Sequence, residues 1–151
     1  MSDNFKIINF KELPSNLQEE AIQGVATINS VGYEDLHDSR VIQWAKILGN
    51  PANVVLCMVK GGNLLGVIAL SARNKIKLFN IEALWSKKDE SKALFREKKF
   101  TVGTALYLEA EKIAIAREFD IYRGAPNEHG EKFFKRLDAD HNPHFKPIRR
   151  R

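Results

Sequence analysis

Residues 98–106 place basic, hydroxyl-bearing and small side chains directly before a strong helical pattern. The first turn of a helix leaves backbone N–H groups unpaired, and the helix dipole favours a negative charge there. Gly103 and Ala105 would let a pyrophosphate approach the backbone closely, and the hydroxyls of Thr101 and Thr104 would add donors. The stretch therefore predicts a phosphate-binding helix start. An ordinary helix start with surface lysines is the alternative, because short glycine motifs also match by chance.

Glu82 is the second candidate for a role in chemistry. It is the single acidic residue in the apolar pattern from Ile76 to Trp85. A carboxylate inside a strand that is otherwise buried costs free energy unless it has a partner or a function. We therefore treat Glu82 as a candidate site residue. The alternative is a side chain that faces solvent or pairs with a lysine.

Length and composition indicate the kind of protein that holds these residues. The chain has 151 residues, of which 44% are hydrophobic, which is enough for one domain with a single core. Its one cysteine, Cys57, lies in an apolar strand pattern, which indicates a buried side chain rather than a nucleophile. No signal peptide is recognisable, and no apolar stretch approaches the roughly 20 residues that span a bilayer. We expect a cytoplasmic protein that does not contact membranes.

The net charge of +5 is concentrated in two places. The basic residues gather between Ser86 and Lys99 and in the terminal Arg149–Arg151. A nucleic-acid-binding protein more often carries a basic stripe across one face of its fold. The distribution favours a local anion site plus a basic tail.

Hydrophobic periodicity and turn residues predict a strand, two helices, a hairpin, a strand, a helix, a strand and a final helix. Their expected bounds are 5–10, 15–28, 38–48, 54–60 with 64–70, 76–85, 102–118, 119–122 and 128–137. The hairpin is almost continuously apolar, which predicts that both faces of the sheet are covered. Ser15 and Gln18 have the spacing of a capping box. In the helix at 102–118, the periodicity predicts an exposed Glu111.

Residues 138–151 are predicted to be a basic tail that follows a domain spanning residues 1–137. This segment contains two prolines and ends in three arginines, so we expect an irregular chain or one short strand. His141 and His144 lack a firm third ligand in such a tail, so no metal site is predicted.

With these elements placed, the chain resembles the GCN5-related N-acetyltransferase (GNAT) family over residues 54–137. The stretch Lys98–Leu106 is similar to the acetyl-CoA loop of the family, R/Q-x-x-G-x-G/A followed by small residues and leucine. Ile81–Trp85 is similar to the strand before that loop. Pro126–Asn127 with Glu131–Leu137 is similar to the asparagine-then-aromatic helix that follows. The resemblance implies a single-domain α/β (α+β) fold with a mixed central sheet flanked by helices.

The resemblance also implies an activity, in which a primary amine of a small molecule or protein attacks the thioester of acetyl-CoA. Because the amine is protonated at neutral pH, a base must accept its proton, and Glu82 is our candidate, acting directly or through water. A backbone N–H near Ala83–Trp85 would hold the oxyanion. Asn127, which contacts the cofactor in the family, also fits a plain helix N-cap here. The residues implied to contact the cofactor are Ala83, Leu84, Trp85, Lys98, Lys99, Phe100, Thr101, Val102, Gly103, Thr104 and Asn127.

The sequence departs from the family pattern at positions that matter for chemistry. Lys98 replaces an arginine or glutamine, and Thr101 replaces the first glycine. Phe133–Phe134 stands where many members have Phe-Tyr, so the usual acid for the leaving thiolate is missing. Tyr122 or His129 could supply that proton. A tyrosine packed in the core and a surface histidine in a first helical turn are the competing interpretations.

Two other function classes remain open from the sequence. The departures would also suit a CoA-binding or inert GNAT-like domain that works through protein contacts. A nucleic-acid-binding protein that uses its basic loop and tail is disfavoured, because few aromatic residues are interleaved with the basic ones. The acceptor amine is undefined at this stage, and a homodimer is neither predicted nor excluded.

Overall fold

The computed structural model describes residues 5–27, 34–87, 101–124 and 128–145. Its elements follow the predicted order, with two short 3-10 helices added. None of the helices within these ranges has both the length and the apolarity needed to cross a membrane. In chain order the elements are β1 (Phe5–Asn9), η1 (Phe10–Glu12), α1 (Ser15–Thr27), α2 (Glu34–Gly49), β2 (Val54–Lys60), β3 (Asn63–Arg73), η2 (Asn74–Ile76), β4 (Leu78–Ser86), α4 (Val102–Arg117), β5 (Asp120–Tyr122) and α5 (Glu128–His141).

The five strands form one mixed sheet in the order β1-β2-β3-β4-β5. The first four are antiparallel neighbours, and β5 joins β4 in parallel. A parallel neighbour needs a crossover connection, and α4 lies on the chain between β4 and β5. The predicted mixed central sheet flanked by helices is confirmed.

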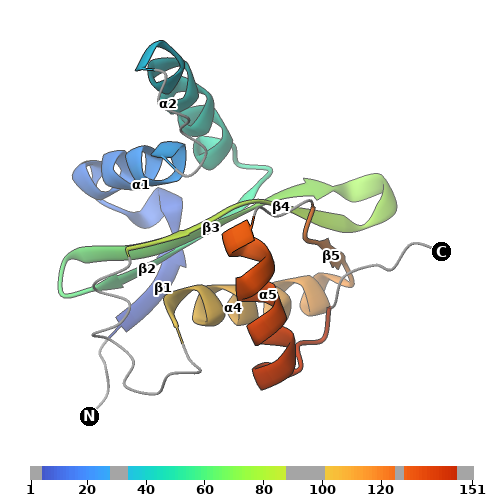
Figure 1. The fold of residues 1–151 in the computed structure, drawn as a ribbon. Coiled ribbons are helices and arrows are strands. Elements are labelled where there is room, and N and C mark those ends of the chain that lie inside the picture. Colours follow the sequence, from blue (N-terminus) through green and yellow to red (C-terminus); the bar gives the residue numbers. More distant parts are fainter. Residues whose placement is uncertain (1–4, 28–33, 88–100, 125–127, 146–151) are drawn as a thin grey trace.

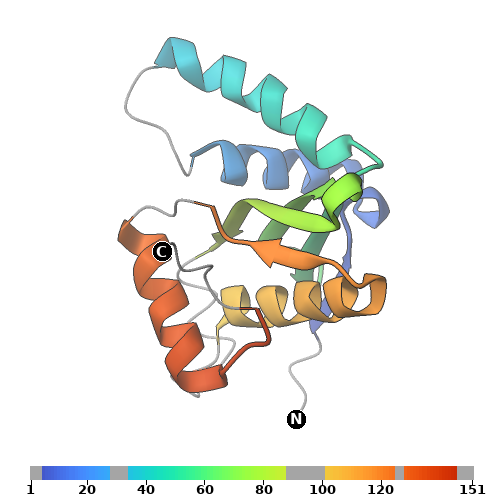
Figure 2. The same ribbon diagram turned by 90° about the vertical axis from the view of Figure 1, so that its right-hand side faces the viewer.

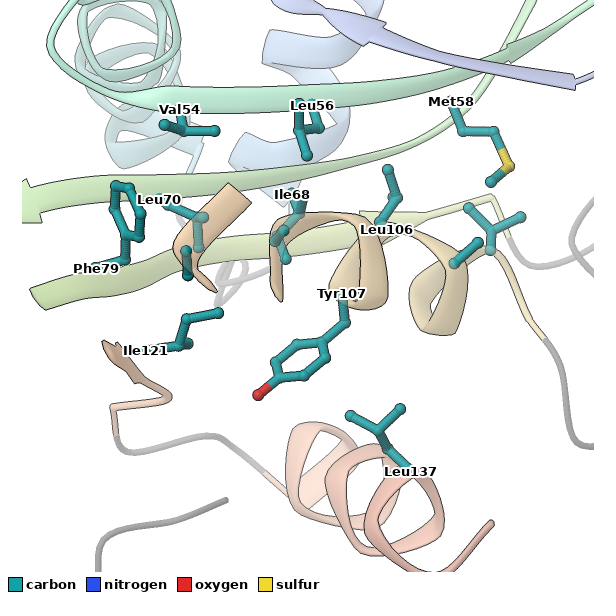
Figure 3. Packing of buried hydrophobic residues seen from close by; sticks show 14 of the residues in the cluster. Val54, Leu56, Met58, Ile68, Leu70, Phe79, Leu106, Tyr107, Ile121 and Leu137 are labelled. Atoms are coloured by element: carbon teal, nitrogen blue, oxygen red, sulfur yellow. The ribbon is translucent and has the colours of Figure 1, made fainter. Parts of the chain in front are cut away.

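Helices cover the two faces of the sheet in different ways (Figures 1 and 2). α1 packs on one face with α2 stacked above it, whereas α4 packs on the other face with α5 beside it. We call these faces the α1 side and the α4 side. The hairpin explains the layering, because Val54, Leu56 and Met58 belong to the core on the α4 side, while Val55 and Cys57 belong to the core on the α1 side. Figure 3 shows the core on the α4 side.

The hairpin of β2 and β3 matches its prediction. Its turn contains Gly61 and Gly62, both with positive φ (55° and 82°), a conformation that favours glycine. Cys57 in β2 is fully buried, and burial raises the pKa of its thiol to about 12. Such a thiol is not ionised at neutral pH, in agreement with a packing role.

The start of α1 differs from the predicted capping box. The Gln18 side chain donates to the carbonyl oxygens of Phe10 (3.3 Å) and Leu13 (3.1 Å). The Pro14 carbonyl already accepts from the backbone N–H groups of Leu17 and Gln18, both at 3.0 Å, so Ser15 lies inside the helix. Gln18 therefore ties η1 to α1 and does not cap the helix.

The predicted long helix is present as α4, but the prediction that Glu111 is exposed was wrong. Glu111 is 6% exposed, and its Oε2 accepts the backbone N–H of Phe145 at 2.8 Å. Periodicity could not reveal this, because the hydrogen-bond partner lies 34 residues further along the chain. A buried carboxylate next to an unpaired backbone donor satisfies both groups.

Arg123, directly after β5, is the centre of a buried polar cluster. Its guanidinium donates to both carboxylate oxygens of Asp138 (2.9 and 2.8 Å), to the Tyr107 hydroxyl (3.3 and 3.2 Å) and to the Phe145 carbonyl (2.8 Å). It also lies over the Phe134 ring, 4.5 Å from its centroid. Burial lowers the pKa of Arg123, but the hydrogen bonds to Asp138 and Tyr107 outweigh it and raise the pKa above its ordinary value. The Arg123 cation is therefore buried together with its counter-ion, Asp138.

This cluster changes the predicted end of the domain. α5 continues past the expected end at Leu137 to His141, so the predicted boundary at residue 137 falls inside a helix. Both backbone groups of Phe145 are held, by Glu111 and Arg123. The chain up to Phe145 thus packs with the domain, whereas residues 146–151 lie outside the described ranges.

Candidate active site

The two halves of β4 differ in how they are paired. β3 pairs with β4 along its whole length, but β5 pairs only with Leu78, Phe79 and Asn80. Within the described residues, no strand pairs with Ile81–Ser86 on the β5 side. The backbone of this half is therefore available to a ligand that can pair with it as an added strand would.

Strand alternation identifies the peptide groups that point to this unpaired edge. The Lys87 N–H donates to the Leu65 carbonyl on β3 at 2.9 Å. Residues two apart in a strand point the same way, so Trp85 and Ala83 also direct their N–H and C=O groups to β3. Leu84 and Ser86 consequently direct theirs to the unpaired edge. Of the residues predicted to hold the oxyanion, Ala83–Trp85, Leu84 is the one that directs its N–H to the unpaired edge.

A β-bulge lies where β4 changes from one half to the other. Leu70 of β3 pairs with Ile81, and Ala69 pairs with Ala83, so Glu82 is the extra residue. Its carboxylate is exposed and accepts a hydrogen bond from the Ser71 hydroxyl at 2.7 Å. A bulge re-aims a side chain relative to the regular strand. Glu82 is thus a solvent-facing carboxylate beside the unpaired edge, held by a serine and not by a lysine.

Three neighbouring strands place polar side chains together on the α1 side, beyond the apolar core. Leu70 and Ala72 pack on the α4 side, so Ser71 between them faces the α1 side, and its hydrogen bond brings the Glu82 carboxylate there. By the same alternation Asn80 and Tyr122, which are directly paired, face the α1 side. We call this set the polar patch; its members are Ser71, Asn80, Glu82 and Tyr122.

Two members of the polar patch bear on the predictions made for this region. Tyr122 is 37% exposed, so the competing interpretation of a tyrosine packed in the core does not describe it; the buried tyrosine is Tyr107. The Oδ1 atom of Asn80 is buried, and no described residue donates a hydrogen bond to it. The patch therefore combines an exposed carboxylate, an exposed phenol and an unsatisfied amide oxygen.

The first turn of α4 is capped by Thr101. The Thr101 side chain accepts from the Thr104 N–H at 3.1 Å, and its backbone carbonyl accepts from the Ala105 N–H at 3.0 Å. This leaves the Gly103 N–H without a helical acceptor at the positive end of the helix dipole. The cap uses a lone pair of the Thr101 oxygen and leaves its O–H proton, so the predicted role of Thr101 as a hydroxyl donor is compatible with the cap.

Gly66 of β3 brings the α4 start and the unpaired half of β4 together. A Cβ atom on Gly66 would lie 2.7 Å from Val102 Cγ1 and 2.8 Å from the Trp85 carbonyl oxygen. Both distances are too short for a side chain, so only glycine lets α4 approach the strands here. The start of α4 and the C-terminal half of β4 therefore both lie close to Gly66.

The missing side chain of Gly103 also makes room for α5, which the sequence pattern did not indicate. A Cβ atom on Gly103 would lie 3.1 Å from the Phe133 ring, so the missing side chain makes room for α5. The residue is buried in this contact. On the side of Gly103 where a side chain would lie, the close neighbour is therefore an aromatic ring. The predicted approach of a pyrophosphate concerns the backbone of Gly103.

α1 is fixed against the same half of β4 from the other side. A Cβ atom on Gly24 would lie 2.4 Å from the Trp85 ring, so the indole lies directly on the α1 backbone. Lys87 forms an ion pair with Glu20 of α1. Ala83 packs with Trp85 on the α1 side, whereas Leu84 packs on the α4 side.

The remaining predicted site residues are only partly visible. Lys98, Lys99, Phe100 and Asn127 lie outside the described residues. His129 belongs to the first turn of α5. The structure thus places Glu82 and Tyr122 in the polar patch on the α1 side, residues 83–85 directly after Glu82 on β4, and residues 101–104 at the start of α4. The other site predictions stay as they were.

Sequence reasoning missed three residues that shape this region. Gly66 carried a signal, because a glycine inside an apolar strand often marks a close approach of another backbone. Gly24 carried a weaker one, as a helix-interior glycine that costs helix propensity. Ser71 carried none, since its partner Glu82 is brought within reach by a bulge that no local pattern announces.

Comparisons with known proteins concern the fold. No family model matches the chain, and no curated protein matches it. Solved structures do, among them an aminoglycoside 6'-N-acetyltransferase complexed with coenzyme A (TM-score 0.60, 19% identity, 77% of this chain and 59% of that one). This chain therefore spans about three fifths of that neighbour.

Two further neighbours cover most of both chains. The PaiA N-acetyltransferase of Thermoplasma acidophilum, in complex with coenzyme A, gives a TM-score of 0.58 at 18% identity over 89% of this chain and 87% of that one. The ribosomal-protein-alanine N-acetyltransferase of Brucella melitensis gives 0.57 at 16% identity over 97% and 98%. The chain has the fold of N-acetyltransferases, as predicted.

Proposed function

We propose that this chain is a divergent GNAT-like N-acetyltransferase that moves an acetyl group from acetyl-CoA to a primary amine. One observation carries the proposal: the half of β4 that lacks a β5 partner adjoins the start of α4 at Gly66. An extended amide-bearing arm can pair with the strand edge while its phosphates meet the helix terminus. The neighbours solved with coenzyme A share the fold that produces this arrangement.

The residues present suit acetyl-CoA as cosubstrate. Its pantetheine amides would pair with the outward peptide groups of Leu84 and Ser86. Its pyrophosphate would meet the Gly103 N–H at the positive end of α4, with Thr101 keeping the helix capped. The cosubstrate supplies an acyl carbon that an amine can attack.

The polar patch would receive the amine. Glu82 takes a proton from the incoming ammonium, directly or through water, so that the nitrogen lone pair can attack the thioester carbonyl. The Leu84 N–H would stabilise the negative charge that forms on the carbonyl oxygen. As the C–N bond forms and the C–S bond breaks, the leaving thiolate needs a proton, and the exposed Tyr122 hydroxyl is our candidate donor.

CoA binding without transfer is the second candidate function. Phe134, which stands where many members of the family have the tyrosine, is buried and has no proton to give. If neither Tyr122 nor His129 supplies one, the chain would bind CoA but turn over poorly. Binding and turnover must therefore be measured separately.

Binding can be tested at Thr101, because aspartate and asparagine are both good N-cap residues. Thr101→Asp keeps the cap but places a negative charge where the pyrophosphate would lie. Repulsion between charges about 4 Å apart costs about 1–4 kcal/mol, so we expect the affinity for acetyl-CoA to fall at least about fivefold. Thr101→Asn is the matched neutral control and should bind like the wild type.

Isothermal titration with acetyl-CoA gives the affinities, and thermal unfolding without ligand shows that both variants fold. Equal affinity in the two variants would place the cofactor elsewhere. Turnover is then followed as release of the CoA thiol with small primary amines and with lysine-containing peptides. Tight binding with no thiol release for any amine would favour the second candidate.

A further inference from the structure

We infer that Ser71 is a positioning residue, which holds the Glu82 carboxylate in the orientation that receives the acceptor ammonium. The inference rests on the proposed function and adds a residue on β3 to a site otherwise built from β4, β5 and α4. Its observation is the hydrogen bond of 2.7 Å from the Ser71 hydroxyl to Glu82 Oε2.

The bulge explains why Glu82 needs such a partner. An extra residue in a strand lies outside the regular pairing, so its side chain is not aligned by a cross-strand neighbour. Glu82 is also exposed, and a free glutamate side chain samples several rotamers. A hydrogen bond from a neighbouring strand removes much of that freedom before the acceptor arrives.

Ser71 is well placed to act as the fixed point. It lies in β3 and pairs with Asn80 of β4, one residue past the end of the β2 pairing at Leu70. Its short side chain has a single heavy-atom torsion, so its oxygen position follows the backbone. The hydroxyl has one proton, and donating it to Oε2 leaves Oε1 of Glu82 free for the acceptor.

Ser71 is the residue that donates to the Glu82 carboxylate within the described ranges. Other charged or titratable groups of the described residues on this face are few. Arg73 lies two residues beyond Ser71 on β3, and Asp120 and Tyr122 lie on β5. Lys87, at the α1 end, is paired with Glu20. Within the described ranges, none of these groups forms a hydrogen bond to the Glu82 carboxylate.

The test compares Ser71→Ala with Ser71→Thr in the full chain, using acetyl-CoA and an amine that the wild type accepts. Ser71→Ala should lower kcat about tenfold and leave the KM for acetyl-CoA unchanged. Ser71→Thr keeps the hydroxyl and suits a strand, so it should recover most of the rate. Ser15→Ala, at an exposed serine of α1, is the control for a serine change without this contact.

A double-mutant cycle separates positioning from a general structural effect. If Ser71 acts through Glu82, Ser71→Ala should have no further effect on kcat in a Glu82→Gln background. An additive loss there, or a wild-type rate for Ser71→Ala, would overturn the inference while leaving the proposed function standing. A wild-type rate for Glu82→Gln would instead remove the proposed role of Glu82, and the role of Ser71 with it.

Discussion

The same strands build both faces of the sheet, but the two faces are completed differently. On the α4 side, apolar packing continues to Ile121 of β5, and Arg123 closes the end of the core with satisfied hydrogen bonds. On the α1 side, apolar cover ends at Ala83 and Trp85, and the polar patch lies beyond it. We call the α4 side the closed face and the α1 side, with its polar patch, the open face.

The contrast shows how one strand can serve two purposes. Residues of β4 that point to the α4 side contribute to stability, whereas the bulge at Glu82 turns a carboxylate to the open face. We therefore expect substitutions on the two sides to separate: those in the polar patch should alter rate, and those in the closed core should alter the free energy of unfolding. The predictions below test that separation.

The largest effect is expected at Glu82. Glu82→Gln keeps the shape of the side chain but removes the proton acceptor, so the rate at neutral pH should fall roughly 10²–10⁴-fold. The midpoint of thermal unfolding and the affinity for acetyl-CoA should stay unchanged, because the side chain is exposed. Part of the rate should return at high pH, where the amine loses its proton to solvent. A parallel loss of stability would show that the open face is structural after all.

A smaller effect is expected where α1 meets β4. Gly24→Ala would place a methyl group 2.4 Å from the Trp85 ring, and overpacking of this kind costs about 1–3 kcal/mol. In a Trp85→Ala background the space is free, and the same change should stabilise the protein by up to about 1 kcal/mol through helix propensity. Chemical denaturation of the four proteins measures both values. The same sign in both backgrounds would mean that the indole does not set the helix position.

On the closed face, Asp138→Asn should reduce the free energy of unfolding by about 1–2 kcal/mol, because a charge-assisted pair becomes a weaker one. Arg123 keeps its bonds to Tyr107 and to the Phe145 carbonyl, which limits the loss. Since the cluster lies on the α4 side of the sheet, opposite the polar patch, kcat should hardly change. A large drop in kcat at unchanged stability would link the two faces.

The smallest effect is expected at the basic end. Arg149–Arg151 follow a proline and show no apolar pattern, so their deletion should leave the melting temperature nearly unchanged. Deletion from Pro143 onward removes the Phe145 backbone groups that Glu111 and Arg123 hold, and should destabilise the protein clearly. If the shorter deletion destabilised equally, the closed face would extend into the arginines.

Local patterns predicted the parts of the fold that depend on neighbouring residues. The apolar hairpin, the long helix and the order of the elements follow from periodicities that tertiary contacts reinforce. The exposure of individual residues in the candidate site was harder to predict from local patterns. Tyr122 and Tyr107 are both tyrosines in apolar surroundings, and only the pairing of β5 with β4 decides which of them is exposed.

The features that the sequence did not reveal share a physical cause, because in each case the two interacting residues lie far apart along the chain. Glu111 matches an exposed helix position until Phe145 arrives to donate its N–H. Gly103 matches a phosphate-binding glycine, and its packing against Phe133 is an additional role that local spacing does not reveal. In both cases a local rule gave a reasonable reading, and a residue at least 30 positions later determined the environment.

The contact between Gly24 and Trp85 has an optical consequence. The chain has two tryptophans, and the second, Trp44, lies on α2. Indole emission depends on the polarity around the ring, so a Trp44→Phe variant would carry a single fluorophore on the strand that we assign to the cofactor arm. A ligand that displaces water from β4 should shift that emission, whereas one bound elsewhere should not. The glycine that makes room for the indole thus gives the protein a built-in reporter for that strand.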